Sequence, residues 1–313
     1  MMDPLSEVLG RMRPSSPLAQ LATDHGDWCV QFQPHGYIKC YVVLRGTCEI
    51  AVEDGIPVAL TAGDCVLLPG QRAFRLGSDL TLPAVPLEIY HQQKLSRGQH
   101  VTAEQSSGTG MSEVTFIGSA FTLPEPQAAL LLEALPPLIH LEQATGEASL
   151  RWSLERMEQE LREERPGARL MAEHLAQVFL IQALRVHLER VGTGQVGWLF
   201  ALTDPQLSGV LGALHAEPAY LWTVQEMAER AGLSRSTFAA RFREAVGLPP
   251  QAYLTRWRML LAADRLTGGG ESVADIALSL GYESEAAFST AFKRVMGCPP
   301  RRYGRQGHQM AAD

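Results

Sequence analysis

The residues of this chain with the clearest chemical potential belong to a motif that occurs twice near its C-terminal end. The copies begin at Val224 and Val273, and each reads as a short helix, a turn that starts with glycine, and a second helix that ends at Gly-x-Pro-Pro. Outward positions on the second helices carry small, polar or basic side chains. Arg and Lys suit phosphates or guanine, and short side chains let a helix approach base edges. The candidate DNA-binding residues are Arg235, Ser236, Ala239, Ala240, Arg243, Ser284, Glu285, Ala286, Ser289, Thr290 and Lys293.

Two pairs of phenylalanines must position these side chains. Phe238 and Phe242 are four residues apart, as are Phe288 and Phe292, so each pair shares one helix face and is expected to anchor it in a core. This layout is typical of a helix–turn–helix, whose second helix enters the DNA major groove. Residues 251–267 are predicted to form a connecting helix that sets the separation of the two reading helices, so that they enter successive major grooves roughly 34 Å apart.

The distribution of charge agrees with this interpretation. The net charge is −7, but the first 204 residues hold 15 Lys and Arg against 24 Asp and Glu, whereas the remaining residues hold 12 against 10. Only the C-terminal third is basic, and a polyanion attracts basic surfaces. We therefore expect only the C-terminal part to contact DNA.

The second copy carries a family resemblance. The stretch "SVADIALSLGYESEAAFSTAFKRVMGCPPRRY", residues 272–303, resembles the AraC/XylS transcription regulators almost throughout. The resemblance implies that both units contact double-stranded DNA, the first usually with more sequence discrimination, and that the protein contacts RNA polymerase. Ala239 and Ala240 depart from the longer polar residues common in the family. Apolar contact with a thymine methyl group would then replace hydrogen bonds in the first unit.

The N-terminal part has a different pattern. Four β-type runs at 37–46, 47–55, 57–64 and 65–76 are separated by turn residues, which favours a barrel or sandwich. The stretches "DPLSEVLGRMRPSSPL", "YVVLRGTCEIAV", "GDCVLLPG" and "EALPPLIHL" resemble the cupin-type N-terminal domain found in one branch of the same family. The expected fold class is therefore α+β: an N-terminal cupin-like β-barrel with accessory helices, followed by an all-α double helix–turn–helix domain.

The resemblance to cupins implies an internal pocket, and its residue types indicate what the pocket holds. Metal-dependent cupins place histidines where this chain has Cys40, Tyr41 and Phe74, and His35 lies in a Pro-His-Gly turn. We therefore expect no metal, no cofactor and no enzymatic activity, and an apolar small-molecule effector instead. A cupin enzyme remains the alternative that bound metal would reveal. The candidate pocket residues are Cys40, Tyr41, Cys48, Cys65 and Phe74.

The five cysteines include no CxxC pair and do not indicate a disulfide framework. Cys40, Cys48 and Cys65 lie on consecutive predicted strands, where they would be close enough to face one another. A thiol-based redox sensor is therefore the alternative function. The other interpretation is that they are small buried apolar side chains.

Residues 168–191 read as a long helix that is apolar on nearly all sides and so needs more than one neighbour. The strand domain is one candidate neighbour, and a second copy of the chain in a homodimer is another. The candidate dimerisation residues are Leu175, Val178 and Phe179. The expected organisation is an effector-sensing and dimerisation domain at 1–191, a linker at 192–205 and a DNA-binding domain at 206–313. With no secretory signal and no apolar run of about 18 residues, we expect a cytoplasmic protein without a membrane partner.

Overall fold

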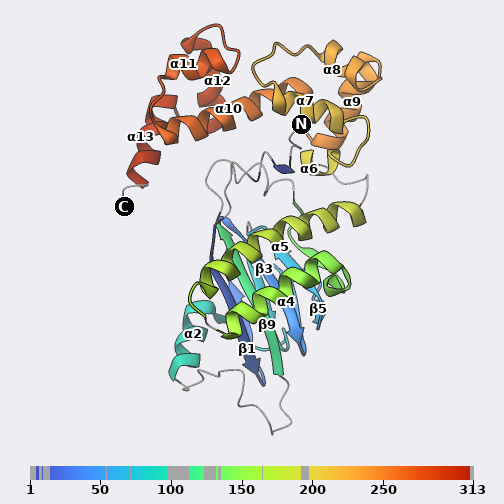
Figure 1. The fold of residues 1–313 in the computed structure, drawn as a ribbon, viewed down its shortest axis with the longest axis vertical. Helices are drawn as coiled ribbons and strands as arrows, with labels where there is room; N and C mark the ends of the chain where they lie inside the picture. Colours follow the sequence, from blue (N-terminus) through green and yellow to red (C-terminus); the bar gives the residue numbers. More distant parts are fainter. Residues whose placement is uncertain are drawn as a thin grey trace. The chain divides into compact units, whose positions relative to one another are not determined.

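The computed structural model divides the chain into two compact units, which are described separately below (Figure 1). The strand unit comprises residues 14–123 and 135–187, and the helical unit comprises 188–313 with the short segments 1–13 and 124–134. The residues that the structure describes are 5–6, 9, 15–53, 55–70, 72–96, 113–122, 132, 135–163, 165–191 and 197–310.

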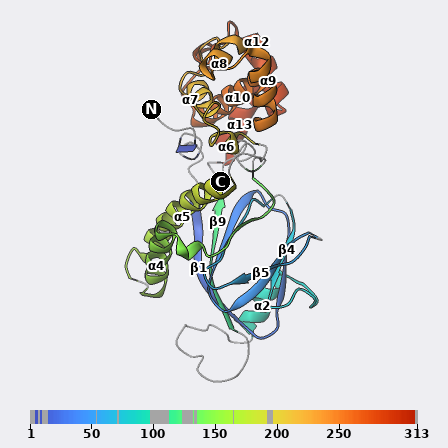
Figure 2. The ribbon, with the colours of Figure 1, turned by 90° about the vertical axis from the view of Figure 1, so that its right-hand side faces the viewer.

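The strand unit contains two five-stranded sheets. Every pair is antiparallel except β2 with β8, and the two sheets lie face to face in Figure 2. The expected α+β class with a β-rich N-terminal part is confirmed, and the described strands form two facing sheets that end at β1, β10, β5 and β8 rather than one closed barrel. The first sheet is ordered β1 (Ser15–His25), β9 (Glu113–Thr122), β3 (Tyr37–Arg45), β6 (Cys65–Leu68) and β10 (Ile139–Leu141); the second is ordered β5 (Val58–Thr61), β4 (Thr47–Val52), β7 (Phe74–Gly77), β2 (Cys29–Phe32) and β8 (Val85–Pro86).

Alternation along the strands fills the space between the sheets with apolar side chains. Val43 and Val66 point inward from the first sheet, and Ile50 and Phe74 from the second, all nearly fully buried. The rings of Phe32 and Phe74 stack with centroids 4.3 Å apart and planes 4° apart. This aromatic contact joins the neighbouring strands β2 and β7 of the second sheet and is part of the apolar core between the sheets.

Three longer helices accompany the sheets: α2 (Leu87–Ser96), α4 (Ala148–Glu163) and α5 (Ala168–Val191). Helices α4 and α5 lie side by side over the outer face of the sheet that contains β1, β9 and β3 (Figures 1 and 2). Leu150, Leu154 and Met157 form the buried stripe of α4, in agreement with the periodicity of the sequence. None of the helices that the structure describes is long and apolar enough to cross a bilayer.

The helical unit consists of a duplicated helical motif around one long helix. The connecting helix predicted at 251–267 is confirmed as part of α10, which packs against α9, α11, α12 and α13. The predicted linker at 192–205 contains helix α6, and its residues 192–196 lie outside the described part of the chain. The helices are α6 (Trp198–Ala201), α7 (Ser208–Ala216), α8 (Val224–Arg230), α9 (Arg235–Val246), α10 (Pro250–Gly268), α11 (Val273–Ser279), α12 (Glu285–Met296) and α13 (Pro300–Met310).

Two turn glycines have equivalent places in the two copies but different surroundings. Gly232 and Gly281 both have positive φ, at 67° and 80°, which favours glycine because other residues are strained there. A Cβ atom added at Gly281 would lie 2.2 Å from the Ala219 carbonyl oxygen, whereas one added at Gly232 would meet nothing within 4 Å. The backbone at Ala219 therefore leaves no room for a side chain at Gly281, whereas the space around Gly232 is free.

Candidate functional site

The two copies of the motif bury the same side chains. Phe238, Phe242, Phe288 and Phe292 are each 0% exposed. Tyr253 packs edge-on against Phe242 with ring centroids 5.8 Å apart, and Tyr303 packs against Phe292 in the same way at 5.6 Å. The inward face of each second helix is thereby fixed, and its opposite face is left outward.

The predicted DNA-binding residues largely lie on these outward faces, on α9 and α12. Ala239, Glu285 and Ser289 are half-buried. The other eight candidates are exposed: Arg235, Ser236, Ala240, Arg243, Ser284, Ala286, Thr290 and Lys293. The two faces are not alike, because the first has two arginines beside alanines and the second has hydroxyls beside one lysine.

Two of the candidates have structural tasks within the unit. Ser284 is the N-cap of α12, and its hydroxyl accepts a hydrogen bond from the backbone N–H of Ala287 at 3.2 Å. Glu285 forms an ion pair with Arg301, with an N–O distance of 3.1 Å. Arg301 was not among the sequence candidates, yet its side chain is 75% exposed. The basic run of 301–305 at the start of α13 was the signal that would have found it.

Arg241 on α9 has a role different from that of the outward arginines. Its Nε and Nη2 atoms donate to Asp204 Oδ2 at 3.1 and 2.8 Å, and Asp204 Oδ1 accepts from the backbone N–H groups of Gln206 and Leu207. Burial alone would raise the pKa of Asp204, but the guanidinium and the N–H groups outweigh it and hold this pKa below its usual value. The first reading helix is thus fastened to the segment before α7.

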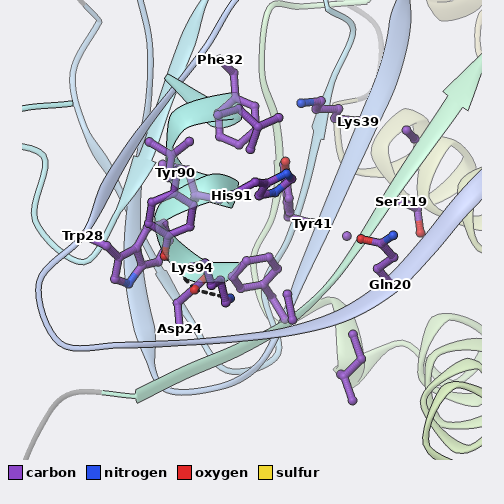
Figure 3. A pocket seen from close by; sticks show the side chains of 18 of the residues that line it. Gln20, Asp24, Trp28, Phe32, Lys39, Tyr41, Tyr90, His91, Lys94 and Ser119 are labelled. Atoms are coloured by element: carbon purple, nitrogen blue, oxygen red, sulfur yellow. Dashed lines mark hydrogen bonds and ion pairs between the residues drawn. The ribbon is translucent and has the colours of Figure 1, made fainter. Parts of the chain in front are cut away.

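The strand unit contains a cavity of about 440 Å³ between β1, β2, β3, β9 and α2 (Figure 3). A volume in this range is typical of pockets for small organic ligands. Its aromatic lining comes from elements far apart in the sequence: Trp28, Phe32, Tyr37, Tyr41, Tyr90 and Phe116. The geometry provides a partly open pocket with aromatic walls within one unit.

Only one of the five predicted pocket residues lines this cavity. Tyr41 does, whereas Cys48 and Phe74 belong to the apolar core between the sheets. Cys40 and Cys65 lie on the opposite face of the first sheet, because successive residues of a strand alternate in direction and Tyr41 points inward. Their positions in neighbouring strands suggested that both line the pocket. Because side chains alternate between the two faces of a sheet, they point away from it.

The thiols are held in forms with little reactivity. Cys40 and Cys65 are both buried, with their Sγ atoms 3.8 Å apart. The hydrogen bond between Cys65 and Cys40 and the burial raise the pKa of Cys65, and burial raises the pKa of Cys48 to about 12. Because the thiolate is the reactive form, this arrangement lends no support to the redox alternative.

The charged lining of the cavity includes the ion pair of Asp24 with Lys94 and a further lysine, Lys39, for which the described residues provide no ion-pair partner. Asp24 accepts a hydrogen bond from the Tyr90 hydroxyl at 2.7 Å and forms an ion pair with Lys94. Lys39 points into the cavity beside Phe32. The sequence analysis named none of these charged residues as part of the pocket. Among the described residues, no three His, Cys, Asp or Glu side chains come together to hold a metal ion.

The dimerisation candidates are divided by burial. Leu175 is 6% exposed and Phe179 1% exposed, so the chain itself covers them. Val178 is 40% exposed on α5. Two of the three candidates are thus part of the protomer's own core, because residues four apart share the face that packs on the sheet.

Comparisons with known proteins agree with both units. A cupin family model matches residues 3–189, and a helix–turn–helix domain model matches 227–306. An AraC-like transcription regulator of Streptomyces lividans is 41% identical over 305 residues, covering 96% of this chain and 98% of that protein. The transcriptional regulator AlkR of Acinetobacter baylyi is 29% identical, covering 97% and 100%.

A solved structure is also similar to the helical unit. The DNA-binding domain of the transcriptional factor AdpA, in complex with a target DNA, is 29% identical with a TM-score of 0.32, covering 33% of this chain and 94% of that one. The matches to whole regulators extend over both units. The chain belongs to the AraC family of DNA-binding transcription regulators, with a cupin domain preceding its helix–turn–helix domain.

Proposed function

We propose that this regulator reads its operator with the outward faces of α9 and α12 and responds to a small molecule in the cavity of the strand unit. The observation that carries the first part is the duplicated Phe anchor, which leaves Arg235, Arg243 and Lys293 exposed on the reading helices. The lysine and arginines bind phosphates, and the small residues between them permit close approach to bases.

The cavity supports the second part of the proposal. Aromatic side chains form much of its lining, and polar groups at several of its walls give it chemical selectivity. A ligand bound there alters the packing of the first sheet, whose outer face α5 covers. The proposed output is a changed placement of the DNA-binding domains of a homodimer, and with it changed contact with RNA polymerase.

Alanine at Arg235, Arg243 or Lys293 is expected to weaken DNA binding about tenfold per residue, because each removes a phosphate or guanine contact. A residue on phosphate also contributes about one unit to the slope of log K against log salt, so the slope becomes shallower. Fluorescence anisotropy with a fragment found by genome-wide mapping of bound DNA measures both quantities between 50 and 200 mM salt.

The matched control for these variants is Arg72→Ala, because Arg72 is an exposed, ion-paired arginine of the strand unit. It should leave affinity and slope unchanged. Wild-type slopes for all three helical variants would refute the assignment of α9 and α12 as the reading surface.

The homodimer is tested at Val178, the exposed member of the predicted contact. Val178→Asp places a charge on an apolar contact and is expected to shift a dimer to a monomer in analytical ultracentrifugation. Ile56→Asp is the control, since Ile56 is an equally apolar but 89% exposed residue outside the helices. A dimer that survives Val178→Asp contradicts the role of this face of α5.

A further inference from the structure

Lys39, which forms no ion pair with any carboxylate of the described residues, faces the cavity. Residues 37, 39 and 41 of β3 share one face, and Tyr37, Lys39 and Tyr41 all line the cavity. Lys39 is only 8% exposed. A lysine is almost never buried to this degree without a partner, so the groups around its ammonium need to be examined.

Aromatic rings surround the ammonium of Lys39. Its Nζ atom lies 3.9 Å from the ring centroid of Phe32 and 5.4 Å from that of Phe74. Such cation–π contacts are worth about 0.5–2 kcal/mol and do not replace a full hydration shell. Within the described part of the chain, no carboxylate forms an ion pair with Lys39; Glu88 acts on it only through its field from an exposed position on α2.

The second lysine of the cavity provides an internal comparison. Lys94 is paired with Asp24 and donates to the Thr23 carbonyl oxygen at 2.9 Å. Figure 3 shows this pair well apart from Lys39, with the ring of Tyr41 and the side chain of His91 in between. The protein thus neutralises half-buried Lys94 by itself, whereas no carboxylate of the described residues forms an ion pair with the more deeply buried Lys39.

Burial lowers the pKa of the Lys39 ammonium. Desolvation lowers the pKa of Lys39 to about 8, with Glu88 opposing the shift. Near neutral pH the ammonium is therefore still charged, and its neighbours among the described residues are aromatic rings rather than an ion-paired carboxylate. Gln20 and Ser119 lie on the same side of the cavity in Figure 3 and offer further donors.

We infer that the ligand of this cavity is an organic monoanion, a carboxylate on an aromatic or other apolar body, with the carboxylate on Lys39 and the body among Trp28, Tyr41 and Phe116. The inference rests on the proposed effector role of the cavity and names the chemical class of the effector. A carboxylate provides the missing counter-charge and accepts a charge-assisted hydrogen bond. The aromatic walls accept an apolar body of matching size.

Calorimetric titration of the full chain with benzoate, 2-naphthoate and octanoate, each beside its neutral primary amide, tests the inference. At pH 7 at least one acid should bind 10-fold or more tightly than its amide, because a hydrogen bond to a charged group is worth about that factor or more. Lys39→Met should abolish the preference for the acid and leave amide binding nearly unchanged. Lys39→Arg keeps the charge and should retain a preference.

The pH dependence provides a second readout. The acid is ionised throughout, so its affinity should be constant from pH 6.5 to 7.5 and fall above pH 8 as free Lys39 loses its proton. Lys39→Met should have a flat profile. The other titratable groups facing this space are Asp24, Tyr37, Tyr41, Tyr90, His91 and Lys94, with His35 and Glu88 nearby, and a profile that is unchanged in Lys39→Met assigns the dependence to them and overturns the inference.

The outcomes separate this inference from the proposed function. Equal affinity for acid and amide, or binding of none of the six probes, overturns the anion site. Lys39-dependent binding that leaves operator binding unchanged supports the anion site and refutes the effector role. A DNA-binding response to an amide that survives in Lys39→Met supports the effector role and overturns the inference. Thermal unfolding of Lys39→Met confirms that the variant is folded.

Discussion

Gly281→Ala is expected to lower the free energy of unfolding of the helical unit by about 2–5 kcal/mol and to abolish operator binding. A non-glycine residue at positive φ costs about 1–2 kcal/mol. Overpacking adds roughly 1–3 kcal/mol, and here the new Cβ atom would lie 2.2 Å from the Ala219 carbonyl oxygen, a backbone atom with no rotamer to change. Hydrogen exchange of α11 and α12 in the full chain measures the local loss.

Gly232→Ala is the matched control because its turn has the same place in the first copy. Its Cβ atom would meet nothing within 4 Å, so only the backbone cost of about 1–2 kcal/mol applies. Operator binding should weaken slightly and α8 and α9 should keep most of their protection. Equal losses for the two variants would show that the segment around Ala219 moves aside freely and would contradict the steric argument.

Asp204→Ala is expected to destabilise the helical unit by about 2–4 kcal/mol. The substitution removes the acceptor of two backbone N–H groups at the start of α7 and of two hydrogen bonds from Arg241, and hydrogen bonds to a charged group are worth about 1.5–3 kcal/mol each before compensation by water. Arg241→Ala should cost less, because the N–H groups keep their acceptor. Urea unfolding followed by the fluorescence of the tryptophans in this unit compares the two.

The same carboxylate predicts a pH dependence with a definite sign. The pKa of Asp204 is lower in the folded chain than in the unfolded chain, so its contribution is fully present above the usual carboxyl range and is lost as pH falls through the folded pKa. Asp204→Asn should therefore flatten the decrease in stability of the helical unit below about pH 4. If the stability of this variant falls with pH as steeply as that of the wild type, the decrease comes from other carboxylates.

The helical unit was largely predictable from the sequence because its signals are local. Glycine and proline mark the turns, residues such as Thr223 and Ser272 cap helices within three positions, and Phe238 and Phe242 repeat at the helical period. Spacing did not reveal the task of Glu285, whose partner Arg301 lies 16 residues away on another helix. The spacing of apolar residues along a helix specifies which face is buried. It does not specify which charged side chains on different helices form ion pairs.

The sequence predicted that the strand unit contains a pocket, but of the five lining residues that it suggested only Tyr41 lines the cavity. Its walls come from strands whose register joins residues 20 and 118 or 39 and 120, which no local pattern encodes. Helix α2 has polar and apolar residues mixed around its circumference, so the sequence did not predict it, and with it Tyr90 and Lys94 were missed. The resemblance to the cupin motif suggested Cys40 as a pocket residue. Side chains alternate along β3, however, and its neighbours Lys39 and Tyr41 are the ones that face the cavity.

The buried ammonium of Lys39 also has a consequence for how long the protein survives in a cell. An unpaired buried charge reduces the stability of the empty fold, and a ligand that binds only the folded state adds RT ln(1 + [L]/Kd) to it. Cellular proteases act on unfolded molecules, and a change of about 1–2 kcal/mol alters abundance several-fold. With the proposed anion as its ligand, the protein is expected to be degraded faster when that ligand is scarce, so that its copy number would follow ligand supply slowly.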